Sequence, residues 1–167
     1  MICARKAARC IPHNDRGVMD ELQPLLEVGI GTTVLLSVLV IHGAGMLLIQ
    51  RGFERFWPAM AARRRRIVRN LFLAALILGL LATHYLEILV WAATLAGIGA
   101  FADLRQSFYF AGGAYTTYGS EGVYLPAQWR LLGFVIATSG LFTFGWTTGI
   151  LVSIVNRFFQ PRRGEHA

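Results

Sequence analysis

The sequence has almost no lysine and little cysteine. Lys6 is the single lysine among 16 basic residues, and the two cysteines are Cys3 and Cys10. A disulfide between these neighbours would not connect separate parts of the fold, so free thiols are expected. The sequence also lacks a nucleophile elbow, a glycine-rich phosphate loop and a Cys/His cluster with metal-ligand spacing. No enzymatic activity and no cofactor are therefore expected.

Long polar stretches are scarce as well, and the apolar residues gather in blocks. They make up 55% of the chain. The blocks are Val28 to Ile49, Leu71 to Phe101 and Leu131 to Val155. Each reaches or exceeds the roughly 20 residues that a helix needs to cross a hydrocarbon core. The blocks predict an all-α integral membrane protein with three transmembrane helices.

The net charge of +7 and a pI near 10.3 raise the question of nucleic acid, but the distribution of arginine argues against it. Seven arginines fall in residues 51–70, and three more follow the third block. Both clusters lie on one side of a three-span layout, and the positive-inside rule makes that side cytoplasmic. Anionic lipid headgroups, not nucleic acid, are the expected partners of the arginine-rich connector. The expected location is a cell membrane, as a multi-pass protein of a bacterial inner membrane with the N-terminus outside.

This layout divides the chain into five segments. The tail before the first helix is expected to be extracellular or periplasmic, and its start is either Met1 or Met19. The connector is expected to hold an interfacial helix, because Phe56 and Trp57 lie beside arginines. The segments are the tail 1–27, the first transmembrane helix 28–50, the basic connector 51–70, a pore domain 71–157 and a cytoplasmic tail 158–167.

The segment between the second and third blocks is too polar for lipid and too short for a domain. Asp103 is a plausible helix N-cap, an aromatic stretch follows it, and Gly112 and Gly113 come near the end of that stretch. The motif "TTYGSEG" follows from Thr116 to Gly122. This pattern predicts a re-entrant segment, a short helix that dips into the bilayer and a non-helical return. Non-helical backbone at membrane depth is tolerated only where it is buried in protein or lines water.

Four stretches of the second half together resemble the potassium channel pore family, in its compact bacterial form with one pore loop per chain. They read "THYLEILVWA", "SFYFAGGAYTTYG", "LPAQWRLLG" and "GLFTFGWTTGILVSIV". The resemblance implies a pore helix and a filter in each chain, and a homotetramer around one axis. The implied filter and ion-binding residues are Thr116, Thr117, Tyr118, Gly119, Ser120 and Glu121.

The implied filter departs from the family pattern Thr-Thr-x-Gly-Tyr-Gly-Asp at three positions. Ser120 stands at the family tyrosine, Glu121 at the second glycine and Gly122 at the acid. We therefore expect passive conduction of monovalent cations with weak potassium selectivity. Glu121 is also a candidate divalent cation site, because hard cations favour clustered carboxylate oxygens. The alternative is a non-conducting or regulatory subunit of the same fold.

Charged and polar residues inside spans are functional hypotheses by default. His84 and Glu87 are three residues apart and share one helix face, which indicates a brace behind the filter that Trp91 joins. A proton or metal site is the alternative, and His42 of the first block is its candidate third member. In the third block, Gly140, Gly145 and Gly149 indicate either close helix contacts or a gating hinge, and both readings stay open.

Overall fold

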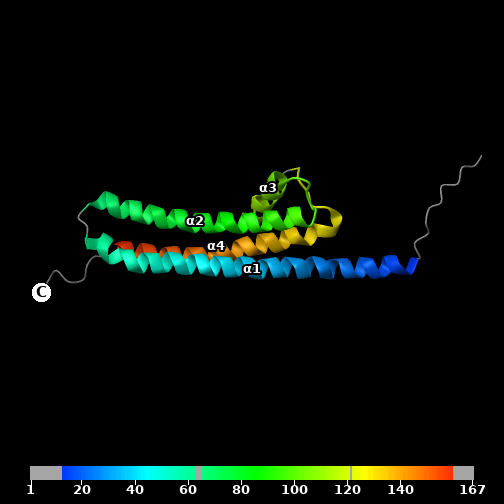
Figure 1. The fold of residues 1–167 in the computed structure, drawn as a ribbon, viewed down its shortest axis with the longest axis horizontal. Coiled ribbons are helices and arrows are strands. Elements are labelled where there is room, and N and C mark those ends of the chain that lie inside the picture. Colours follow the sequence, from blue (N-terminus) through cyan, green and yellow to red (C-terminus); the bar gives the residue numbers. More distant parts are fainter. Residues whose placement is uncertain (1–12, 63–64, 121, 160–167) are drawn as a thin grey trace, which may run out of the picture.

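The computed structural model describes residues 13–62, 65–120 and 122–159, and these form helices and connecting loops without a strand. Three long helices lie side by side, and a short helix lies beside one of them near one end (Figure 1). The elements are α1 (His13–Ala62), α2 (Arg66–Gly97), α3 (Leu104–Tyr115), the 3-10 turn η1 (Ala127–Trp129) and α4 (Arg130–Phe159).

Three stretches are long and apolar enough to cross a membrane. They are Leu22–Ala62, Arg66–Gly97 and Ala127–Phe159, with mean hydropathies of 2.1, 2.0 and 1.5 in their best windows. Helices satisfy their own backbone hydrogen bonds, which is what a lipid environment demands. The prediction of an all-helical chain with three helices long and apolar enough to span a membrane is confirmed.

The first helix is longer than the sequence predicted at both ends. It begins at His13, inside the expected tail, and it continues through the expected interfacial helix to Ala62. Aromatic packing holds this extension to the bundle. Phe53 stacks on Trp57 with centroids 5.3 Å apart, and Trp57 in turn contacts Phe158 of α4 at 5.3 Å. The connector between the first two spans is correspondingly short, and Arg63 and Arg64 lie outside the described residues.

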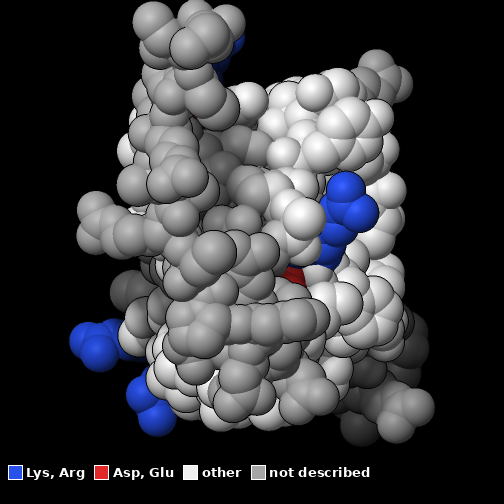
Figure 2. All heavy atoms as spheres, turned by 90° about the vertical axis from the view of Figure 1, so that its right-hand side faces the viewer, with Lys and Arg blue, Asp and Glu red and all other residues white. Residues whose placement is uncertain are grey.

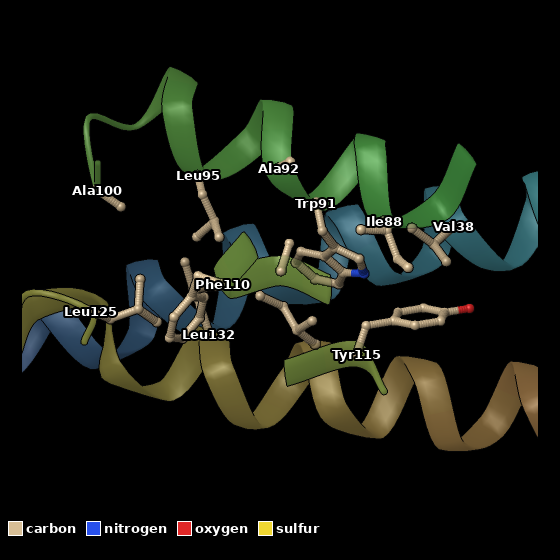
Figure 3. Packing of buried hydrophobic residues seen from close by; sticks show 12 residues of the cluster. Val38, Ile88, Trp91, Ala92, Leu95, Ala100, Phe110, Tyr115, Leu125 and Leu132 are labelled. Atoms are coloured by element: carbon tan, nitrogen blue, oxygen red, sulfur yellow. The ribbon is translucent and has the colours of Figure 1, made fainter. Parts of the chain in front are cut away.

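The opposite end of the bundle holds α3 between α2 and α4. Asp103 caps α3 as predicted, since its side chain accepts a hydrogen bond from the Arg105 backbone nitrogen at 3.1 Å. The apolar core at this end is built around Trp91, Leu95 and Leu132, all fully buried (Figure 3). The short helix thus packs on α2 and α4 with one face, while Leu104 and Tyr109 on its other face are exposed.

Two polar contacts tie α1 to η1 and to the start of α4 in the same chain. The buried carboxylate of Glu27 accepts a hydrogen bond from the Leu132 backbone nitrogen at 3.0 Å. The Gln23 side chain donates to the Gln128 carbonyl at 3.3 Å. The first backbone amides of a helix have no partner within it, so an acid at this position satisfies one of them and complements the helix dipole.

Candidate functional site

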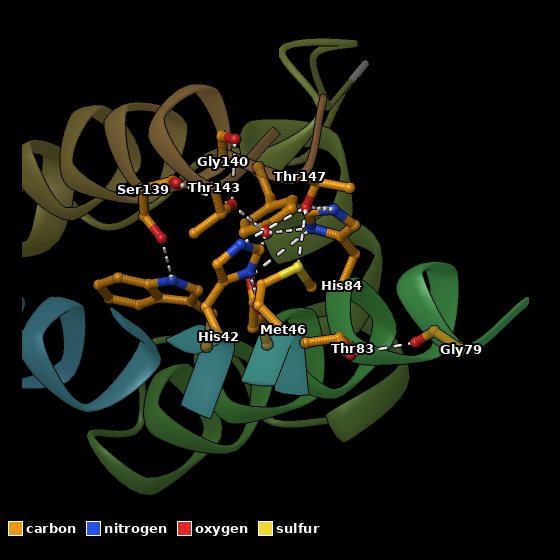
Figure 4. A network of polar contacts seen from close by, with 12 residues as sticks. His42, Met46, Gly79, Thr83, His84, Ser139, Gly140, Thr143 and Thr147 are labelled. Carbon is orange, nitrogen blue, oxygen red and sulfur yellow. Dashed lines mark hydrogen bonds and ion pairs between the residues drawn. The ribbon is translucent and has the colours of Figure 1, made fainter. Parts of the chain in front are cut away.

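Five polar side chains from four helices meet in the interior, level with the end of α3. They are His42 of α1, His84 and Glu87 of α2, Tyr115 of α3 and Thr147 of α4. His42, Glu87 and Tyr115 have no exposed surface, and His84 is 5% exposed. Figure 4 shows the two imidazoles facing Thr147. A buried polar cluster of this kind is stable only if its members satisfy one another.

The five side chains form a closed ring of hydrogen bonds. His42 Nδ1 lies 2.7 Å from Glu87 Oε1, and the Tyr115 hydroxyl donates to the other carboxylate oxygen, Oε2. His84 Nδ1 lies 2.8 Å from the Tyr115 oxygen. The Thr147 hydroxyl closes the ring, at 2.9 Å from His84 Nε2 and 3.4 Å from His42 Nε2. We call these five residues the polar ring.

Helix periodicity explains how the sequence places these groups. His84 and Glu87 are three residues apart on α2 and therefore share a face, as predicted. Ser139, Thr143 and Thr147 are four residues apart on α4 and form a hydroxyl stripe toward the same point. Such side chains are costly against lipid and find partners across helix interfaces.

The hydroxyl stripe extends the polar ring toward the rest of α2. Thr143 Oγ1 lies 2.6 Å from the Tyr115 hydroxyl. The indole nitrogen of Trp91 donates to Ser139 Oγ at 3.2 Å. Trp91 therefore lies near His84 and Glu87 along α2, but its indole nitrogen hydrogen-bonds to Ser139 on α4.

Aromatic rings surround the imidazoles. Phe144 stacks on His84 with centroids 4.4 Å apart, and Trp146 contacts His42 at 5.2 Å. These rings line the cluster with apolar surface, and hydrogen bonds in such low-dielectric surroundings are electrostatically stronger than in water. An ionised carboxylate there needs donors and a compensating charge nearby, which the imidazoles are placed to supply.

Donor atoms of His42, His84 and Glu87 lie within 4.8 Å of one another, a spacing that a metal ion could use. Each of these atoms, however, is already engaged in a hydrogen bond. A metal would have to replace the bonds to Tyr115 and Thr147. The hydrogen-bonded brace accounts for the arrangement without a metal.

The residues predicted as a filter follow Tyr115 directly. Thr116, Thr117, Tyr118 and Gly119 are all exposed, although Tyr115 beside them is fully buried. Thr117 has φ +58° and Gly119 has φ +93°. A positive φ is ordinary for glycine but is an outlier for a β-branched threonine, and such outliers cluster at functional sites.

Contacts within the loop give it a defined course. The Gly119 nitrogen donates to the Gly113 carbonyl at 3.0 Å. A Cβ at Gly113 would lie 2.2 Å from the Gly119 oxygen, so the glycine permits this close return. Ser120 Oγ donates to the Val123 carbonyl at 2.9 Å. Glu121, the candidate divalent site, lies outside the described residues.

The three glycines predicted in α4 have different surroundings. A Cβ at Gly140 would lie 1.9 Å from the Tyr115 carbonyl oxygen, whereas nothing lies within 4 Å of one at Gly145 or Gly149. Gly140 therefore serves close contact with α3. The helix runs without interruption from Arg130 to Phe159 through all three positions.

Sequence reasoning missed three contributors to the site, namely Tyr115, Thr143 and Thr147. The signal for the two threonines was present in the four-residue spacing of Ser139, Thr143 and Thr147 within an apolar block. For Tyr115 the only signal in the sequence was its position directly before the threonine pair. That His42 joins His84 and Glu87 was considered as an alternative, and the structure brings the three together.

Comparisons with known proteins give no further assignment. No protein-family model matches the chain, and the searches of curated proteins and of solved structures each returned no match. The resemblance to potassium channel pores thus stays a prediction from the motifs of the sequence.

Proposed function

We propose that the chain is the pore-forming subunit of a tetrameric cation channel, in which α3 is a re-entrant pore helix and Thr116 to Glu121 form the filter. The observation that carries the proposal is the transition at the end of α3. Tyr115 is locked in the polar ring, and the next four residues are exposed in a strained, defined loop. Ion filters are built from backbone carbonyl groups, and the buried Tyr115 would hold such an exposed segment in place.

The length and depth of α3 support a re-entrant segment. Its 12 residues span about 18 Å, too short to cross a bilayer. Tyr115 at its end contacts Glu87, which lies ten residues before the end of α2 and hence about 15 Å down that helix. The chain then returns through residues 116–126 to the start of α4. Helices α2 and α4 pack against the descending helix. The non-helical return after Tyr115 is exposed in the single chain, so in the proposed assembly it would have to line water or be covered by neighbouring chains.

One loop cannot enclose an axis, so the proposal requires several chains. The exposed surface of α4 carries Thr138, Gly145 and Thr148 among large apolar side chains such as Leu141 and Phe142. In the proposed tetramer this face continues the pathway below the loop. The family resemblance implies four chains, and under the positive-inside rule the end of the bundle at the junction of α1 and α2 would face the cytoplasm.

The second candidate is a non-conducting subunit of the same fold. Ser120 favours it, because this residue replaces the family tyrosine and its hydroxyl closes a local turn onto Val123. An aromatic strut between loop and pore helix is thereby lost. Such a subunit would assemble without passing ions.

Ion flux through the purified full chain in liposomes tests the proposal. We expect potassium and sodium to pass with little preference, at rates well above those of empty liposomes, and chloride not to pass. Mass measurement of the same protein in lipid nanodiscs gives the number of chains in the assembly, and we expect a tetramer. A tetramer without cation flux would favour the non-conducting subunit, and a monomer or dimer would contradict the channel.

A further inference from the structure

We infer that the polar ring of His42, His84, Glu87, Tyr115 and Thr147 is a proton-binding site, which holds one proton beyond those of neutral imidazoles and an ionised carboxylate. The inference rests on a count of donors and acceptors around a closed circuit. It concerns the ring itself and does not require that the chain conducts ions.

The count begins with the links of the ring. Five links join the five side chains, and each link needs one proton. Tyr115 and Thr147 supply one proton each, each neutral imidazole supplies one, and an ionised Glu87 supplies none. Four protons for five links leave two acceptors facing each other. One added proton completes the circuit.

The geometry fixes where most of these protons lie. Both oxygens of Glu87 accept, so His42 Nδ1 and the Tyr115 hydroxyl must donate to them. Tyr115 then accepts from His84 Nδ1. The remaining nitrogens, Nε2 of both imidazoles, face the single hydroxyl of Thr147. Thr147 can donate to one of them only, so the other must carry the added proton.

The added proton has two positions, which are related by a shift of two protons through the Thr147 hydroxyl: its oxygen takes the proton of one Nε2 and gives its own proton to the other. In one, His42 carries it and Thr147 donates to His84. In the other, His84 carries it and Thr147 donates to His42. His84 Nδ1 lies 3.7 Å and His42 Nδ1 lies 2.7 Å from a Glu87 oxygen, so either imidazolium pairs with the carboxylate. The protonated ring is therefore neutral as a whole, which lowers the cost of burial.

Among the described groups that face the ring, the positive charge that pairs with Glu87 comes from the two imidazoles. His42 comes from α1, His84 and Glu87 from α2, and the Tyr115 phenol from α3. The α4 contacts of the ring are the hydroxyls of Thr143 and Thr147 and the rings of Phe144 and Trp146. Among the described residues the ion pairs with Glu87 are those of the two histidines. The Met46 sulfur, 4.0 Å from Thr147, is a weak acceptor that does not alter the count.

The same count defines a matched variant. In Glu87→Gln the amide supplies one donor and one acceptor in the place of two acceptors. Five protons then serve five links, all running in one direction round the ring. The variant therefore keeps the complete circuit with neutral imidazoles and loses the added proton.

Thr147 supplies a second pair of variants. Thr147→Val is nearly isosteric but removes the hydroxyl that both Nε2 atoms face. Three links then remain, between His42, Glu87, Tyr115 and His84, and three protons satisfy them without an extra one. Thr147→Ser keeps the hydroxyl and is expected to keep the proton.

The experiment is nitrogen NMR of the full chain with ¹⁵N-labelled histidine in lipid nanodiscs. The chain has four histidines, and substitution of His13 and His166 by Gln leaves signals from the ring alone. At pH 6 we expect one imidazole proton per chain beyond neutrality, distributed over His42 and His84, in the parent chain and in Thr147→Ser. We expect its loss in Glu87→Gln and in Thr147→Val.

Two results would overturn the inference. Neutral imidazoles in the parent chain at pH 6 would mean that the ring leaves one link unmade. Stoichiometric zinc binding that shifts both imidazole signals and is abolished by Glu87→Gln would assign the cluster to a metal. Absence of ion flux at every pH, with the histidine spectra as expected, would contradict the proposed channel and support the proton site.

Discussion

At the residue scale, the hydroxyl oxygen of Tyr115 makes three polar contacts. Its hydroxyl oxygen meets Glu87, His84 and Thr143, which belong to two different helices. The ring of Tyr115 is itself fully buried in the apolar core (Figure 3). This single side chain therefore joins the end of α3 to α2 and α4.

The first prediction concerns removal of that hydroxyl. Tyr115→Phe leaves a buried carboxylate oxygen and an imidazole donor with one partner fewer, which costs on the order of 1–3 kcal/mol of stability or more. We expect a lower thermal unfolding temperature in detergent. Tyr109→Phe is the matched control, because Tyr109 lies on the same helix and is 46% exposed. Equal unfolding temperatures for the two variants would contradict the role of Tyr115 as an anchor.

At the element scale, much of the architecture follows from the sequence. Three long apolar blocks and the Asp103 cap suffice to predict three long helices and a fourth short one. The C-terminal end of α1 was missed because an aromatic contact with α4, made by Trp57 and Phe158, holds the helix beyond its apolar block. Tertiary contacts of this kind leave no periodic signal in the local sequence.

The candidate site was predictable only where its residues share one helix. The spacing of His84 and Glu87 placed both on one face of α2. The contributions of Tyr115 and Thr147 depend on how α3 and α4 lie against α2, which no local pattern specifies. A closed ring drawn from four helices is a property of their packing.

The second prediction separates the two interpretations of the α4 glycines. Gly140→Ala would place a methyl group 1.9 Å from the Tyr115 carbonyl, so α3 and α4 must move apart. We expect a loss of stability on the order of 1–3 kcal/mol, as for overpacked sites. Unfolding in detergent measures it.

Gly145→Ala is the control on the same helix, since nothing lies within 4 Å of the added carbon. Alanine has the higher helix propensity, so this variant is expected to be at least as stable as the parent. If α4 also bends near Gly145 to gate the proposed pore, the open fraction changes in this variant and ion preference does not. A stable Gly140→Ala would contradict close packing of α4 on α3.

At the scale of the whole molecule, the junction of α1 and α2 and the predicted pore loop lie at opposite ends of the bundle (Figure 1). The arginines of the connector accompany the junction of α1 and α2, while α3 and its loop lie at the far end (Figure 1). Seen from that far end, several basic side chains and a small acidic surface are visible among the described residues (Figure 2).

The last prediction concerns Glu121, which the proposed tetramer would bring near one axis in four copies. Four carboxylates at short range repel one another, so they favour partial protonation or a bound cation. Hard divalent cations prefer clustered carboxylate oxygens. We therefore expect flux that is reduced by calcium or magnesium on the outer side and that changes at mildly acidic pH. Glu121→Gln is expected to remove both effects while the tetramer persists in nanodiscs. Divalent and pH responses that survive in this variant would mean that the carboxylate faces solvent or Arg130, away from the ion path.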